Sequence, residues 1–299
     1  MALPNVQIII LNWNGIDDTR TCLHSLRKIS YTNFNVLVVD NGSSLNESKK
    51  LKTEFPEIDV LRLKKNFGFA LGNVLGIRKL RNKSYDYLLY LNNDTIVTKN
   101  FLEKLVHFSE KNHEVGIVGP AIYYARKQSH LWSAGGIIDF NNGIFRNIQK
   151  LKKTKPLEPY SVDYINGCCL LMKKSLVEDC GSFDSDYFAY VEDVDLNARV
   201  HKLGFTSACV PSSKIFHSVS SASGGEGNLF KERLMTRNIL FFIRKNYKLP
   251  IRLKRIFQVY KYKLSQIAIY IRNGHLPGVQ AIAMGLIQGH FQQLSNEVL

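Results

Sequence analysis

Short apolar runs alternate with helix-like stretches through the first 120 residues, and this alternation most constrains the fold. A continuous apolar run such as residues 6–11 is typical of a strand that is buried on both faces of a parallel sheet. Each run is followed by a polar loop and then by a segment with helical spacing. The four runs are residues 6–11, 36–39, 60–63 and 87–91. We therefore expect an α/β fold with a mostly parallel sheet and helices on both faces.

Polar side chains follow these runs where each expected strand ends. In strand order they are Asn12-Trp13, Asp40, Asn66 and Asn92-Asn93-Asp94. Ligands of open α/β sheets bind just beyond the carboxyl ends of the strands, so these side chains are candidates for one binding site. The alternatives are structural. Asn and Asp are common turn residues, and Asp40 is also placed to cap the next helix.

The loop after the first expected strand is not a phosphate-binding loop. Its residues, Asn12 to Gly15, match neither the GxGxxG fingerprint nor a P-loop. A bound phosphate would therefore need another counter-charge. Asp94 would supply one by holding Mg²⁺ or Mn²⁺, because these cations take oxygen ligands and bridge phosphate oxygens.

The pattern changes after residue 120. Residues 132–136 and 141–143 are typical of β-hairpin turns, and residues 150–159 form a basic, proline-containing segment that we expect to be a mobile loop. A buried strand is expected at 168–172, a helix from Glu192 to about Gly204, and a further strand at 205–210. His217 lies just past this last strand.

Three carboxylates stand within four residues at the start of the expected helix, namely Glu192, Asp193 and Asp195. A helix N-terminus stabilises anions, so capping is one interpretation. Capping needs only one or two acids, however, and an aromatic run at residues 187–190 suggests a walled pocket. Crowding in a pocket raises the pKa of one carboxylate, which suits a general base. His217 is either a metal ligand or a structural histidine.

Composition indicates a globular protein. The 299 residues are 45% hydrophobic and 22% charged. We expect neither a signal peptide nor a membrane-spanning helix, because the first residues lack a basic region and no apolar run is long enough. The five cysteines, which contain no CxxC pair, are expected to be reduced and mostly buried in a cytoplasmic protein. They are Cys22, Cys168, Cys169, Cys180 and Cys209.

Six segments, taken together and in order, resemble the family 2 glycosyltransferases, which are inverting enzymes of the GT-A fold. The resemblance is greatest to the bacterial rhamnosyltransferase-type members and extends over residues 6–223. The segments are Leu11-Asn12-Trp13-Asn14-Gly15, Val38-Val39-Asp40-Asn41-Gly42-Ser43, Asn66-Phe67-Gly68-Phe69-Ala70-Leu71-Gly72-Asn73, Leu91-Asn92-Asn93-Asp94, Gly181-Ser182-Phe183-Asp184 and Glu192-Asp193-Val194-Asp195-Leu196 with Arg199.

The resemblance implies a donor site for a nucleotide-diphosphate sugar. The residues expected to bind this donor are Leu11, Trp13, Asp40, Asn66, Gly68, Asn92 and Asn93. Asp40 would contact the pyrimidine ring, which fits both dTDP- and UDP-sugars. dTDP-rhamnose is the leading expectation, with UDP-sugars next.

The resemblance also implies roles for the acidic residues. Asp193 matches the catalytic base, while Asp94 and His217 match the ligands of Mg²⁺ or Mn²⁺. Glu192, Asp195 and Trp132 are expected to support the site or line its acceptor side. The chain departs from the family's DxD motif, because an asparagine replaces its first acid. We therefore expect modest, donor-dependent metal affinity.

The C-terminal part is strongly basic. Ten Lys or Arg and no Asp or Glu lie between Leu234 and His275, within a chain of net charge +15. We expect residues 1–227 to form the GT-A domain and 228–299 a helical extension. Its basic amphipathic pattern favours contact with an anionic membrane surface, and so a peripheral location on the cytoplasmic face of the membrane. Packing of its apolar side on the catalytic domain is the alternative.

The favoured function is transfer of a sugar, with rhamnose as the leading candidate, to a glycan or lipid-linked acceptor of cell-surface polysaccharide. A non-catalytic protein that binds nucleotide-sugars or nucleic acid through its basic helices is the alternative. The acidic residues at 192–195 would repel a phosphate backbone, so we expect no nucleic acid partner. A nucleotidyltransferase would need a basic, glycine-rich loop after the first strand.

Overall fold

The structure is a computed structural model that describes residues 2–139, 144–151, 155, 157–219 and 228–291. The expected hairpin turn at 141–143 and parts of the expected loop at 150–159 lie outside these residues. So does the end of the C-terminal extension, from residue 292.

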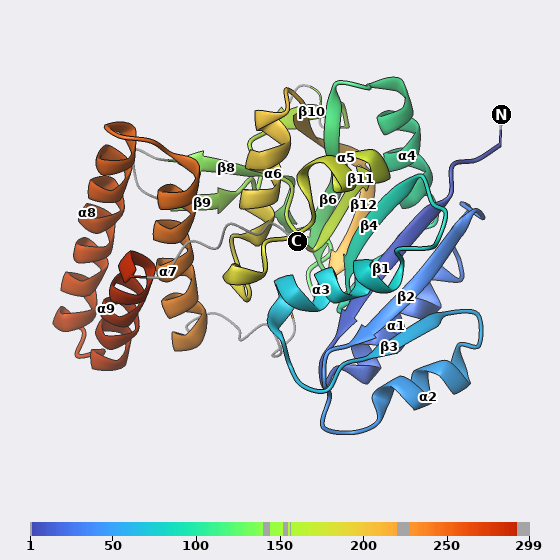
Figure 1. Ribbon diagram of the computed structural model, residues 1–299, viewed down its shortest axis with the longest axis horizontal. Coiled ribbons are helices and arrows are strands. Elements are labelled where there is room, and N and C mark those ends of the chain that lie inside the picture. Colours follow the sequence, from blue (N-terminus) through green and yellow to red (C-terminus); the bar gives the residue numbers. More distant parts are fainter. Residues whose placement is uncertain (1, 140–143, 152–154, 156, 220–227, 292–299) are drawn as a thin grey trace.

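Strands and helices alternate through the first half of the chain (Figure 1). The strands are β1 (Val6–Asn12), β2 (Phe34–Asp40), β3 (Asp59–Arg62), β4 (Tyr87–Asn92), β5 (Thr95–Val97), β6 (Val115–Tyr124), β7 (Leu131–Ser133), β8 (Gly136–Asp139), β9 (Ile144–Asn147), β10 (Tyr160–Val162), β11 (Cys169–Lys173) and β12 (Thr206–His217). The helices are α1 (Ile16–Leu26), α2 (Glu47–Glu54), α3 (Gly68–Lys79), α4 (Phe101–Lys111), α5 (Lys174–Cys180), the 3₁₀ turn η1 (Ser185–Tyr187), α6 (Glu192–Lys202), α7 (Leu229–Asn246), α8 (Ile251–Arg272) and α9 (Leu276–Phe291).

One mixed sheet forms the centre, with the strand order β10-β12-β6-β11-β4-β1-β2-β3. The strands from β4 to β3 in this order are parallel, as the sequence predicts. β11 runs antiparallel between β4 and β6, and β12 is parallel to β6. β8 and β9 form a separate hairpin. The predicted α/β fold with a mixed, mostly parallel sheet is confirmed.

Helices cover both faces of the sheet. Along β1, Ile8 and Ile10 pack into one hydrophobic cluster with α1, α2 and α4, whereas Ile9 packs into another with α3, α5 and α6. This alternation is the reason why the run is apolar throughout, since both of its faces are buried. The three layers are visible in Figure 1, where α3, α5 and α6 lie in front of the sheet.

The structure extends several predicted elements and adds others. The strand predicted at 205–210 continues to His217, with a register irregularity between Val210 and Lys214, so His217 is the last strand residue rather than a loop residue. β5, β10 and α5 have no counterpart among the predictions. β5 and β10 are three residues each and α5 is seven, too short to show a clear period.

The C-terminal helices form a group beside α6 and the β8–β9 hairpin (Figure 1). α7 is largely buried, and a third hydrophobic cluster joins its Phe241 and Phe242 to Tyr187 and Val194, which precede the C-terminal helices in the chain. α9 crosses α7 closely, because a Cβ added at Gly285 would lie 2.6 Å from a backbone oxygen of α7. α7 thus packs on the part of the chain that precedes it, as the alternative interpretation of the C-terminal extension predicts. The division at residues 227 and 228 stays a prediction.

Candidate active site

The sheet register brings the polar strand ends to one edge. Asn12 of β1 pairs with Asp40 of β2, and Leu11 pairs with Asn92 of β4 on the other side. β1, β2 and β4 are parallel, so their carboxyl ends lie together. β11 is antiparallel, and its first residue, Cys169, therefore lies at the same edge, beside the end of β4. This is the edge at which the sequence predicts a ligand site.

Asp40 is fully buried at this edge and stabilises the segment that follows β2. Its carboxylate accepts hydrogen bonds from the backbone nitrogens of Ser43, at 3.0 Å, and Ser48, at 3.3 Å in the first turn of α2. The carboxylate of Asp40 therefore caps the N-terminus of α2, as the structural interpretation predicts. Its contact with a pyrimidine ring stays a prediction, and each carboxylate oxygen, with one amide bound, can accept one further hydrogen bond.

The end of β1 combines a buried amide with an exposed ring. Asn12 is buried, donates to the carboxylate of Glu47 at 2.8 Å and accepts from the hydroxyl of Thr19 at 2.7 Å. Leu11 is half-buried, while Trp13 is 41% exposed. Asn12 thus fixes the loop, and Trp13 offers a large apolar surface at the edge where the donor is predicted to bind.

The loop at Asn66 is held by Asn41, a residue of the second motif that was not among the expected site residues. The side-chain amide of Asn41 donates to the Oδ1 of Asn66 and to the carbonyl of Gly68, each at 3.0 Å. Gly68 has a φ of +84°, and a Cβ there would lie 2.5 Å from the carbonyl oxygen of Phe188. This close approach connects the predicted donor loop to the segment that precedes Asp193.

The two asparagines after β4 have different surroundings. Asn93 donates to the hydroxyl of Thr19 at 3.0 Å and to the carbonyl of Gly15 at 3.3 Å, which ties this turn to α1. The Oδ1 of Asn92 is buried and has no hydrogen-bond partner among the described residues. A buried acceptor without a partner costs about 1–3 kcal/mol, which makes this oxygen a candidate to contact a bound ligand.

Asp94 and His217 meet where β5 pairs with β12. The Nε2 of His217 lies 3.0 Å from the Oδ1 of Asp94, and each side chain is about 5% exposed. Despite this distance, neither ring nitrogen of His217 has a hydrogen-bond partner within the described part of the chain. Trp132 packs edge-on against the imidazole, with the ring centroids 4.6 Å apart. Trp132 therefore supports the pair from the side of β7.

This pair fits a divalent cation. A carboxylate oxygen and an imidazole nitrogen that converge without hydrogen bonding to each other offer two ligands suited to Mn²⁺ or Mg²⁺. Over the ranges that the structure describes, no group of three or more His, Cys, Asp or Glu side chains could hold a metal ion. Phosphate oxygens and water would have to complete the coordination, which agrees with modest affinity in the absence of a donor.

Asp193 and Glu192 form a buried acidic pair at the N-terminus of α6. Asp193 accepts hydrogen bonds from the backbone nitrogens of Gly167, at 2.9 Å, and Val194, at 2.8 Å. Burial raises the pKa of Asp193, and these hydrogen bonds partly oppose the rise. Burial, and then the charge of Asp193, raises the pKa of Glu192 well above its ordinary value. The backbone amides of Gly167 and Val194 thus favour the ionised form of Asp193.

Asp195 does not belong to this acidic pair. Its Oδ2 lies 2.8 Å from the Nε of Arg199 and 3.0 Å from the Nζ of Lys245, and Asn246 donates to its Oδ1 at 3.0 Å. Burial acts to raise the pKa of Asp195, but the charges of Arg199 and Lys245 outweigh it and lower that pKa. Of the three carboxylates that the sequence places together, only Glu192 and Asp193 are therefore crowded against each other. Asp195 instead joins α6 to α7.

The segment before α6 is strained and is clamped by α7, which the sequence did not indicate. Phe188, Tyr190 and Val191 have φ values of +60°, +71° and +74°, a region that costs non-glycine residues about 1–3 kcal/mol each. The buried Nδ2 of Asn238 lies 3.0, 2.8 and 2.6 Å from three carbonyl oxygens of residues 187–190. In the sequence, the one sign of this contact is a polar residue, Asn238, beside the apolar run at 239–243.

Comparison with protein families decides the class. The profile described as Glycosyl transferase family 2 matches residues 7–181, which includes the strand ends and Asp94. The chain belongs to this family. It is therefore a glycosyltransferase, and the binding-protein alternative receives no support from the matches.

This glycosyltransferase has bacterial relatives that match over most of their length. It is 24% identical over 209 residues to the N-acetylglucosaminyl-diphospho-decaprenol L-rhamnosyltransferase of Mycobacterium tuberculosis, covering 63% of this chain and 68% of the relative. It is 22% identical over 219 residues to the dTDP-rhamnosyl transferase RfbF of Shigella flexneri, covering 73% and 71%. The predicted rhamnosyltransferase-like resemblance is confirmed.

Solved structures show that the fold is of the GT-A type. The Mannosyltransferase PcManGT from Pyrobaculum calidifontis, in complex with GDP-Man and Mn²⁺, matches with a TM-score of 0.60 and 14% identity, over 98% of this chain and 82% of that one. GalNAc-T7 with UDP, GalNAc and Mn²⁺ matches with a TM-score of 0.62 and 17% identity over 91% of this chain. The glycosyltransferase spans 59% of the GalNAc-T7 chain.

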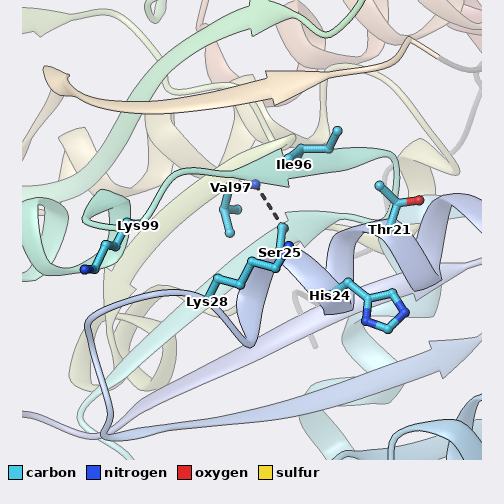
Figure 2. Close-up of a pocket in the computed structure, with 7 residues that line it drawn as sticks. All are labelled: Thr21, His24, Ser25, Lys28, Ile96, Val97 and Lys99. Atoms are coloured by element: carbon cyan, nitrogen blue, oxygen red, sulfur yellow. Dashed lines mark hydrogen bonds between the residues drawn. The ribbon is translucent and has the colours of Figure 1, made fainter.

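Two surface hollows of the glycosyltransferase lie apart from the predicted site residues. One, of about 520 Å³, lies between α1 and β5 and is lined by His24, Lys28 and Lys99 among others (Figure 2). A hydrogen bond of 3.1 Å from the backbone of Val97 to Ser25 crosses its floor. The other, of about 410 Å³, lies near His201 at the end of α6. The site is thus defined by the strand-end residues rather than by either hollow.

Proposed function

We propose that this glycosyltransferase transfers a sugar, with inversion, from a nucleotide-diphosphate sugar to an acceptor hydroxyl. The observation that supports this most is the position of Asp193. Its carboxylate is buried, held by the backbone of Gly167, and has a raised pKa. A raised pKa makes the carboxylate a stronger base, which suits removal of a proton from a hydroxyl.

The acceptor side and the donor side of the site have different roles in this reaction. On the acceptor side, Asp193 takes the proton as the acceptor oxygen forms a bond to the anomeric carbon. The bond from that carbon to the diphosphate oxygen breaks, and the nucleoside diphosphate leaves from the opposite face, which inverts the configuration. No covalent enzyme intermediate is needed. The loop that precedes Asp193 contacts the donor side. In this contact the backbone nitrogen of Ala70 donates to the carbonyl of Phe188 at 3.1 Å.

On the donor side, Asp94 and His217 would hold Mg²⁺ or Mn²⁺. When bound, the cation neutralises the negative charge that develops on the leaving diphosphate. The protein's own contribution is to keep the carboxylate and the imidazole in place, through β5, β12 and the ring of Trp132. Leu11, Trp13 and Asn66 are proposed to contact the nucleotide.

The partners are proposed from chemistry and from the relatives. dTDP-rhamnose is the first candidate donor and UDP-sugars are the second, since two relatives are named as rhamnosyltransferases. A glycan or lipid-linked acceptor of cell-surface polysaccharide is proposed, since one relative is named for a diphospho-decaprenol substrate. We place the protein in the cytoplasm, peripherally on the membrane. Within the described residues, none of the helices combines the length and apolar character needed to cross a bilayer.

A donor panel tests this proposal. Release of nucleoside diphosphate from dTDP-rhamnose, UDP-sugars and GDP-sugars is measured with and without Mn²⁺, and NMR gives the anomeric configuration of the product. Asp193→Asn keeps the shape of the side chain and an oxygen for one of the two backbone amides, those of Gly167 and Val194, so we expect a folded protein with transfer reduced about 10²–10⁴-fold. Asp179→Asn, on an exposed residue of α5, is the matched control. Transfer by a folded Asp193→Asn protein at the normal rate would exclude Asp193 as the base.

A further inference from the structure

The outer face of α8 has a continuous apolar ridge. Leu253, Phe257, Leu264 and Ile271 are 61%, 69%, 57% and 58% exposed. Their spacings of four, seven and seven residues place them along one side of the helix. Large apolar side chains gathered on one exposed face indicate an interaction site, whereas scattered ones do not.

A basic ridge runs beside the apolar one. Lys254, Lys261 and Arg272 are exposed, and each follows a ridge residue or lies one turn from it. The opposite side of α8 is fixed to α7, where the Nζ of buried Lys263 lies 2.8 Å from a carboxylate oxygen of Glu232. The helix is therefore held by its inner side and presents the two ridges outward.

Charge selects the occupant of this face. No acidic residue lies between Leu234 and His275, so the face has no carboxylate of its own to pair with the exposed cations. A second copy of the chain would bring an equally basic ridge against it, and like charges oppose such contact. An anionic lipid surface offers both acyl chains for the apolar ridge and phosphates for the basic one.

We propose that α8 lies flat on an anionic membrane surface through these two ridges. The apolar ridge enters the boundary between headgroups and acyl chains, while Lys254, Lys261 and Arg272 contact lipid phosphates. The helix has 22 residues, which gives a footprint about 33 Å long. Because α7 holds both α8 and the loop before Asp193, docking tethers the catalytic part to the membrane. The functional value of this tethering rests on the proposed lipid-linked acceptor. The docking of α8 itself does not depend on that proposal.

Vesicle co-sedimentation of the full chain tests the docking, with no donor or acceptor present. We expect binding to vesicles of phosphatidylcholine with 30% phosphatidylglycerol, a drop at high salt, and weak binding to pure phosphatidylcholine. Phe257→Ser with Leu264→Ser is expected to weaken binding at least tenfold. Lys254→Gln with Lys261→Gln and Arg272→Gln is expected to weaken it about a hundredfold. Leu45→Ser with Leu157→Ser, at residues 62% and 55% exposed, is the apolar control.

The outcomes separate lipid from protein as the occupant. Because every substituted side chain is exposed, circular dichroism and melting temperature should match the wild type. Loss of anionic vesicle binding in both ridge variants, with binding retained by the control, supports the proposal. Equal binding to neutral vesicles, or ridge variants that bind like the wild type, overturns it. So does a wild-type dimer in analytical ultracentrifugation that the ridge substitutions convert to monomer. Sugar transfer is assayed separately, so failure of the proposed activity leaves this result unaffected.

Discussion

Three carboxylates of one short segment acquire different properties from their surroundings. Glu192 and Asp193 are buried, form no ion pair with the Lys and Arg residues that the structure describes, and have raised pKa values, whereas Asp195 binds Arg199 and Lys245 and has a lowered one. Helical geometry explains the division. Asp195 and Arg199 are four residues apart on one face of α6, so Asp195 points to Arg199 and not to the backbone amide of Gly167 that Asp193 contacts. Separated pKa values within one segment are typical of sites that use acid–base chemistry.

Glu192 makes stability depend on pH. The folded protein retains this proton above the ordinary pKa of 4.5, where the unfolded chain has lost it. The free energy of unfolding therefore falls as pH rises from about 4.5 towards the raised pKa, by up to about 1.4 kcal/mol per pH unit. Glu192→Gln removes this contribution, so we expect its melting temperature to gain on the wild type between pH 5 and pH 8. Exposed Glu114→Gln should show no such gain, and parallel pH profiles for Glu192→Gln and wild type would contradict the raised pKa.

His217 is expected to bind metal directly. In the presence of nucleoside diphosphate, His217→Gln or Asp94→Asn should weaken Mn²⁺ binding about tenfold or more, because each removes one of the two proposed protein ligands. Electron paramagnetic resonance of free Mn²⁺ measures this without any turnover. His107→Gln, at an exposed position of α4, is the control. Unchanged Mn²⁺ affinity in both ligand variants would show that the pair is structural.

At the scale of elements, α7 stabilises the strained entry to α6. Replacing Asn238 by Ala removes the Nδ2 donor from the carbonyls of Ala189 and Tyr190, while the carbonyl of Tyr187 still accepts from Arg237, so we expect a loss of about 2–3 kcal/mol in the free energy of unfolding. Thr236→Val changes a buried residue of the same helix that bonds only within the helix, to Glu232, and should cost less than about 1 kcal/mol. Urea unfolding measures both. Equal losses of unfolding free energy in the two variants would show that the hydrogen bonds of Asn238 to residues 187–190 add no stability beyond helix packing.

Sequence periodicity predicted the long elements and the edge that holds the site. β1, β2 and β4 are apolar because both of their faces are buried, and that property is local to each run. The roles of Asn41 and Asn238 could not be predicted, because each depends on a loop distant in sequence that it contacts only after folding. The family motif implies a base-binding role for Asp40 but not that two backbone amides already occupy its carboxylate.

At the scale of the molecule, the catalytic part and the C-terminal helices share buried structure. The third hydrophobic cluster contains Tyr187 and Val194 from one side and Phe242 and Ile282 from the other. Lys245 of α7 also lies 2.6 Å from Asp184 and 3.0 Å from Asp195, so each side buries charge that the other compensates. Removing one partner of a buried ion pair is strongly destabilising, by about 3–5 kcal/mol.

This shared core predicts that the whole chain unfolds as one cooperative unit. Both tryptophans, Trp13 and Trp132, belong to the catalytic part, so their fluorescence follows the sheet, whereas far-ultraviolet circular dichroism also follows α7, α8 and α9. We expect the two signals to change at the same urea concentration. Lys245→Met should lower both midpoints together, because it leaves two carboxylates without this cation. If α7–α9 lost helix before the tryptophan signal changed, residues 1–227 and 228–299 would be separate folding units.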